Sequence, residues 1–125
     1  MNDLKYLYFL TKVDGLGSVR IKRLLDKFSV ASSVFESSVK EISEVENISE
    51  KTAGTILSST KRFSEFGEDY AYLLEKAGKL SVEITGITDP GYPELLKKIY
   101  DPPVILYTKG NLDKEKLENC VGIVG

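Results

Sequence analysis

The sequence contains no histidine, no tryptophan and a single cysteine, Cys120, among its 125 residues. One cysteine cannot form an internal disulfide, and without histidine there is no plausible zinc site. The sequence also lacks any pattern that pairs a nucleophile with a base, so nothing in it indicates an enzyme. We therefore expect no cofactor, no metal and no catalytic residues.

Long hydrophobic runs are missing as well. No stretch approaches the ~20 apolar residues that a membrane-spanning helix needs, and residues 1–10 lack the basic start and long apolar core of a signal peptide. The content of 42% hydrophobic and 29% charged residues is ordinary for a globular chain. We therefore expect a cytoplasmic protein with no membrane partner, built as one modest domain or as one small domain and a fragment.

The net charge of −2 argues against indiscriminate binding to polyanions, but the charges are unevenly distributed. Residues 1–62 hold ten Lys and Arg against eight Asp and Glu, a net +2, whereas residues 63–125 hold seven against eleven, a net −4. A basic cluster of this kind either contacts a phosphate backbone or is a solvated helix face. Its members are Lys12, Arg20, Lys22, Arg23 and Lys27.

The basic cluster surrounds a pattern that is typical of a helix-hairpin-helix. Apolar residues recur at helical spacing over residues 3–12, where Asp3 is a candidate N-cap, and over residues 18–28. Two glycines suit the turn between them, because glycine adopts positive φ and allows close backbone approach. The second helix then directs its first backbone amides outward, where a DNA phosphate can bind. The alternative interpretation is structural: the two glycines only allow a tight turn between two helices of a helical domain. The candidate DNA-binding residues are Gly15, Leu16, Gly17, Arg20, Lys22 and Arg23.

The same pattern recurs thirty-two residues later. Asn47 and Ser49 replace the two turn glycines, and asparagine tolerates left-handed backbone geometry. Because three glutamates surround this turn, we predict that the second hairpin is structural. Residues 29–40 are expected to form a short helix that connects and seals the two hairpins. The repeated apolar positions are Ile42, Val45, Ile48, Ala53, Ile56 and Leu57.

A long helix and a strand follow the second hairpin. The aromatic and apolar spacing over residues 58–79 predicts a helix with a bend or break at Gly67. Its aromatic residues are predicted to be core, because acidic neighbours argue against a base-stacking surface. Residues 80–85 alternate in polarity, which indicates a strand. We therefore predict a helical tandem helix-hairpin-helix (SAM-like) domain over residues 1–79.

Residues 80–125 predict the first strands of an incomplete Rossmann-like α/β domain, so the whole chain is expected to be an α+β fragment. Residues 104–107 and 121–124 are short, apolar and rich in β-branched residues, as buried strands are. A turn and a short polar helix between them favour a parallel sheet. Without later elements to cover it, the strand at 121–124 is expected to pair at an edge, swap with another chain or pack imperfectly.

Two prolines shape the approach to the first of these strands. Residues 92–99 predict a short helix with Pro93 in its first turn, and Asp101-Pro102-Pro103 forces an extended segment after it. Tyr92, Tyr100 and Asp101 could be mistaken for catalytic groups. Their spacing around the prolines favours a packed corner instead.

Six pieces of this region occur in a specific order. They are Tyr92-Pro93, Leu95-Leu96, Ile99, Asp101-Pro102-Pro103, Lys109-Gly110 and Val121-Gly122-Ile123-Val124-Gly125. Together they resemble the DNA-processing protein A (Smf) family of bacterial transformation and recombination. In that family, the glycine matching Gly125 precedes a small residue and an arginine that open a loop helping to hold single-stranded DNA. The resemblance implies an amino-terminal piece of a longer protein, with Gly125 at the edge of the main DNA site.

The family resemblance also implies a function for the longer protein. It would bind single-stranded DNA, protect incoming DNA and help load the RecA recombinase. The helical domain would be an accessory module that contacts DNA or a protein. The resemblance leaves open whether the full-length protein forms a homodimer. A second interpretation is a protein-interaction or dimerisation module without DNA contact. A third, a nucleotide-binding enzyme, rests on the glycine pair at 122 and 125 and is weak, because the GxGxxG pattern is not completed.

Overall fold

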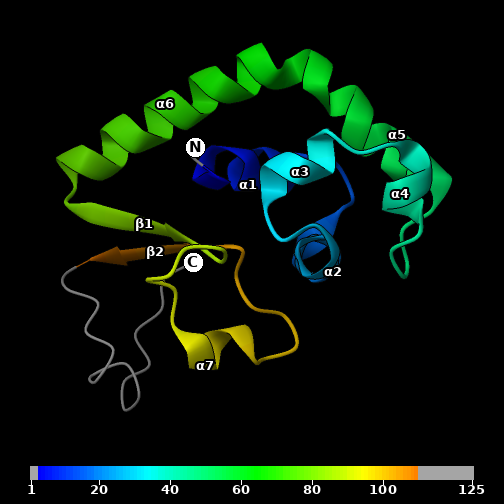
Figure 1. Ribbon diagram of the computed structural model, residues 1–125. Helices are drawn as coiled ribbons and strands as arrows, with labels where there is room; N and C mark the ends of the chain where they lie inside the picture. Colours follow the sequence, from blue (N-terminus) through cyan, green and yellow to red (C-terminus); the bar gives the residue numbers. More distant parts are fainter. Residues whose placement is uncertain (1–2, 110–125) are drawn as a thin grey trace.

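The computed structural model describes residues 3–109. A long helix, α6, extends across α1 from the second hairpin to a small sheet (Figure 1). The predicted polar helix, the strand at 121–124 and Gly125 lie outside the described residues. The elements in chain order are α1 (Asp3–Thr11), α2 (Gly17–Phe28), α3 (Ala31–Phe35), α4 (Val39–Ser43), α5 (Glu50–Ser58), the 3₁₀ helix η1 (Ser59–Arg62), α6 (Phe63–Lys79), β1 (Val82–Gly86), α7 (Glu94–Lys97) and β2 (Ile105–Lys109).

The predicted repeat of the helical hairpin is confirmed by its backbone. The amide of Val13 donates to the Leu10 carbonyl at 3.2 Å, and the amide of Val45 donates to the Ile42 carbonyl at 3.1 Å. These bonds close the two turns at positions thirty-two residues apart. The apolar residues of both hairpins are buried in one core. The two hairpins therefore form a single helical unit.

The first turn glycine and the asparagine that replaces it share a backbone conformation, as the sequence predicts. Gly15 has a φ of +76°, and Asn47, at the corresponding place, has a φ of +66°. Asparagine is one of the few residues that tolerate this left-handed conformation, because its short polar side chain adds little steric cost. The second hairpin can therefore keep the turn without glycine.

Two predicted helix limits are wrong in the helical part. The connecting helix expected within residues 29–40 is present as α3 but ends at Phe35, and Ser38 begins a new helix, α4, through a capping box with Glu41. The predicted helix over 58–79 is divided by η1, and α6 then runs unbroken through Gly67. Phe66 and Tyr70, on either side of Gly67, pack into a cluster with Phe9. Burial of these predicted core aromatics keeps the helix continuous through its weak position.

The two strands form an antiparallel pair in which Ile84 lies opposite Tyr107. The first strand starts two residues later than predicted, and the helix predicted over residues 92–99 shortens to α7. Gly86 lets β1 approach α1 closely, since a Cβ there would lie 2.5 Å from a Leu7 methyl carbon. The parallel partner predicted for β2 falls among the residues that are not described.

The helical part and the sheet share one hydrophobic core. Leu106 of β2 and Leu7 of α1 belong to the same buried cluster, so the described residues on both sides of the predicted boundary at 79/80 pack together. Asp3, expected to cap α1, instead accepts a bond from the Ser32 amide at 3.1 Å and one from the Thr88 hydroxyl at 2.8 Å. Its carboxylate thereby joins α1, α3 and the turn after β1.

Tyr92 anchors the corner between α7 and β2. Its side chain is fully buried, and its hydroxyl donates to the Pro103 carbonyl at 2.7 Å. Burial disfavours the phenolate and raises the pKa of Tyr92 to about 12, from an ordinary value of 10.0. The packed corner predicted from the prolines is therefore present at this residue.

The raised pKa of Tyr92 predicts a loss of stability at high pH. Because the folded pKa lies above the unfolded one, this group's contribution is complete below about pH 10 and is lost as the pH rises towards 12. At about pH 11 the loss should be about 1.4 kcal/mol. Urea unfolding of the chain and of its Tyr92→Phe variant at pH 8 and pH 11 measures this loss. The free energy of unfolding should fall less between the two pH values in the variant than in the unchanged chain. Equal losses in both proteins would contradict the assignment.

Candidate nucleic-acid interface

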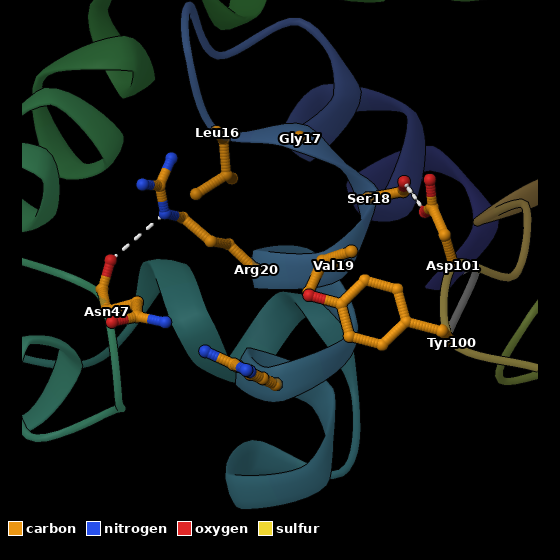
Figure 2. Close-up of a pocket in the computed structure, with 9 residues that line it drawn as sticks. Leu16, Gly17, Ser18, Val19, Arg20, Asn47, Tyr100 and Asp101 are labelled. Atoms are coloured by element: carbon orange, nitrogen blue, oxygen red, sulfur yellow. Dashed lines mark hydrogen bonds between the residues drawn. The ribbon is translucent and has the colours of Figure 1, made fainter.

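The candidate site is an open pocket of about 360 Å³ at the amino-terminal end of α2. Among residues 3–109 no side chain caps this end of α2, so within that part of the chain its first amides have neither an intrahelical acceptor nor a capping oxygen. Gly17 begins the helix with a φ of +75°, a conformation that a residue with a Cβ rarely adopts. Figure 2 shows eight of the nine lining residues labelled. The pocket is lined by Leu16, Gly17, Ser18, Val19, Arg20, Arg23, Asn47, Tyr100 and Asp101.

The corresponding end of the second hairpin is closed. Ser49, which replaces the second glycine, accepts a hydrogen bond from the Thr52 amide at 3.1 Å and so caps α5. Glu50 adds a negative charge to the first turn of α5. An anion at this end of α5 would meet an amide that already has an acceptor and a carboxylate that repels it. The geometry favours the prediction that only the first hairpin offers a phosphate site.

Arg20 joins the two hairpins. Its Nε donates to the Asn47 carbonyl at 3.0 Å, and one of its terminal nitrogens donates to the Gly15 carbonyl at 2.9 Å. The bond to Asn47 is visible in Figure 2. The guanidinium thus satisfies a carbonyl in each turn while its charge remains at the pocket wall. Arg20 is first of all a structural link, and its remaining N–H groups are available to an anion.

Arg23 and Lys22 are separated by the geometry of α2. Arg23 lies one turn after Arg20 and lines the same pocket, and within the described part of the chain no hydrogen bond or ion pair holds its guanidinium. Lys22 is rotated by about 200° from Arg20 around the helix axis. It pairs with Asp26 at 3.6 Å and borders a different pocket. Among the three cations predicted to contact DNA, which are Arg20, Lys22 and Arg23, Lys22 is therefore the one that does not border the hairpin pocket.

The other two members of the predicted basic cluster also lie elsewhere. The ammonium of Lys12 lies over the Tyr8 ring, 5.0 Å from its centroid, and Lys27 donates to the Glu41 carbonyl at 2.6 Å. Neither borders the pocket at the start of α2. The five cations are close in sequence but do not form one continuous patch.

Two residues of the α/β segment complete the pocket. The Ser18 hydroxyl donates to the Asp101 carboxylate, which joins residues 83 apart in the chain. Tyr100 is 79% exposed and borders the pocket, so the predicted packed corner is wrong for this residue although it holds for Tyr92. Tyr100 and Asp101 are far from α2 in sequence, as Asn47 is, and tertiary packing brings all three to the pocket. No local pattern around α2 could have indicated them.

The arrangement is suited to a single small anionic group. Open amides and two guanidinium groups favour negative charge, while Asp101 opposes it. In the part of the chain that the structure describes, no group of three His, Cys, Asp or Glu side chains could hold a metal ion. Over the same residues, no helix has the length and apolar character needed to cross a membrane. Contact with a phosphate stays a prediction for this pocket, and its guanidinium groups and open amides favour it.

Comparison with known proteins finds two family matches and a similar protein. Residues 7–62 match the model of the SAM-like helix-hairpin-helix tandem, and residues 83–125 match that of DNA recombination-mediator protein A. The whole chain is 30% identical over 130 residues to Protein Smf of Synechocystis sp.. The chain spans 31% of the length of that relative. No solved structure gives a significant match.

Proposed function

Because this chain belongs to the DNA-processing protein A (Smf) family, we propose that it binds DNA during recombination through the pocket at the start of α2. The observation that carries this proposal is the contrast between the two hairpins. One presents uncapped amides beside Arg23, and the other caps its amides with Ser49. A backbone phosphate satisfies the open amides and pairs with the guanidinium.

The proposed substrate is single-stranded DNA in the cytoplasm, and the proposed partner is the RecA recombinase. The hairpin provides an accessory contact, because a pocket of this size accepts about one phosphate and the relative contains much sequence without a counterpart here. The proposal is for a binding protein that protects DNA and hands it to the recombinase, without catalysis of its own. Retention of the chain on immobilised RecA in the presence of DNA tests the partner.

Charge reversal at Arg23 tests the DNA contact. Fluorescence anisotropy with a labelled oligothymidylate, at about 50 mM salt, should show affinity about tenfold lower for Arg23→Glu than for the unchanged chain. The slope of log K against log salt should also fall by about one. Lys51→Glu is the matched control, because it makes the same change in charge on an exposed first-turn position of α5.

The two variants separate specific contact from net charge. Circular dichroism establishes that each variant is folded before its affinity is measured. If Lys51→Glu weakened binding as much as Arg23→Glu, the long-range field of the chain would account for the effect and the hairpin site would be refuted. If neither variant changed the affinity, DNA contact by this part of the protein would be refuted.

The outer side of α6 supports a second candidate function, contact with another protein. Tyr72 is 67% exposed and Leu80, at the end of the helix, is 52% exposed. Glu68 and Glu75 are exposed on the same helix, which makes this surface unfavourable for DNA. Loss of RecA retention in a Tyr72→Ala variant with unchanged DNA affinity would favour this function over phosphate binding.

A further inference from the structure

Tyr100 has the surroundings of a base-binding residue. The residue is 79% exposed, yet it borders a pocket that Arg20 and Arg23 also line. In Figure 2 the ring extends from the segment before Asp101 towards Val19 at the start of α2. An aromatic face and two guanidinium groups therefore meet at one opening, and they come from segments that are distant in sequence.

The exposure of Tyr100 has no packing explanation in the described residues. Tyr92, eight positions earlier, is fully buried and uses its hydroxyl on the Pro103 carbonyl. Tyr100 belongs to neither buried cluster and makes no ring contact with another aromatic side chain among residues 3–109. Leaving most of a large aromatic ring in water forgoes the stabilisation that burial gives.

Combining this ring with the phosphate pocket limits the ligands that fit. Single-stranded nucleic acid offers a free base face next to each phosphate, and proteins bind it with cationic grooves and aromatic platforms. Bases in a duplex are already stacked on their neighbours and cannot lie on a side chain without being flipped out. A ring beside the phosphate pocket therefore favours single strands over duplex. A phosphate contact alone cannot make this distinction, because both forms of DNA carry phosphates.

We propose that Tyr100 stacks on a base of the single strand whose phosphate occupies the pocket at the start of α2. The inference rests on the proposed function, because the phosphate contact places the base near the ring. It adds a recognition residue from the α/β segment to a site that the sequence assigns to the hairpin alone. The site is then shared by the two parts of the chain, joined there by Ser18 and Asp101.

Abasic DNA separates stacking from phosphate contact. Affinities are measured for an oligothymidylate and for an abasic oligonucleotide of the same length, with the unchanged chain and with Tyr100→Ala, Tyr100→Phe and Arg23→Glu. Tyr100→Ala should weaken binding to the oligothymidylate by at least about fivefold, and leave binding to the abasic strand unchanged. Tyr100→Phe keeps the ring and should bind both strands as the unchanged chain does. Tyr72→Ala is the matched control, because it removes another exposed ring, on α6.

Each outcome either supports or overturns stacking. If Tyr100→Ala bound the oligothymidylate as tightly as the unchanged chain, stacking would be refuted while the effect of Arg23→Glu still supported the phosphate site. An equal loss on both strands would also refute stacking, because it would show that Tyr100 acts without a base. If Arg23→Glu affected neither strand, the proposed function itself would fail, and with it this inference.

Discussion

Replacing Leu24 or Ile56 with alanine is expected to lower the free energy of unfolding by about 2–5 kcal/mol in each case. Both side chains are fully buried, and they occupy corresponding positions thirty-two residues apart in α2 and α5. Truncation removes apolar contact and leaves a cavity that a packed core fills only in part. Because both residues belong to one buried cluster, the two losses should be similar and the unfolding should remain a single transition.

Urea unfolding followed by circular dichroism measures both losses. Leu95→Ala is a suitable control, because Leu95 is exposed on α7 and its truncation should cost less than about 0.5 kcal/mol. A large loss for Leu24→Ala with little loss for Ile56→Ala would show that the second hairpin contributes little to the core. A biphasic transition in either variant would show that the two hairpins unfold independently.

The tandem hairpin could be predicted from the sequence because two local rules agree in it. Apolar residues repeat at helical spacing, and the turn positions carry residues that tolerate positive φ, which are Gly15 and Asn47. Neither rule depends on the rest of the chain. The turn and the burial of both copies therefore followed from sequence alone.

Two of the errors arose where distant packing overrides local preference. Gly67 weakens an isolated helix, but Phe66 and Tyr70 bury their rings against α1 and keep α6 continuous. Asp3 had the residue type of an N-cap, yet its carboxylate binds Ser32 and Thr88, which local spacing cannot reveal. In both cases the deciding partner is far away in the sequence.

The candidate site was predictable only in its hairpin half. Glycines and cations close together in sequence identified the start of α2, but helical rotation removes Lys22 from the pocket. Tyr100 and Asp101 reach the same opening through the packing of the α/β segment. A nearby proline pattern correctly indicated burial for Tyr92 and gave the wrong expectation for Tyr100.

Arg20→Met is expected to lower the free energy of unfolding by about 2 kcal/mol. Methionine keeps the length of the side chain but removes both donors, leaving the carbonyls of Gly15 and Asn47 without their charged partner. A hydrogen bond to a charged group contributes about 1.5–3 kcal/mol, and partial exposure of the guanidinium reduces the sum of the two. The loss should exceed that of an ordinary surface substitution because it affects both turns.

Lys22→Met is the matched control for Arg20→Met. It removes the same charge from the same helix but breaks only a surface pair between half-buried Lys22 and exposed Asp26, so its cost should be less than about 1 kcal/mol. If the two variants were equally stable, the bonds of Arg20 would add no net stability and its main role would be contact with DNA. Arg20→Met could instead unfold at a lower urea concentration than Lys22→Met and still bind DNA when folded. That result would show that Arg20 positions the two hairpins and that Arg23 is the phosphate ligand.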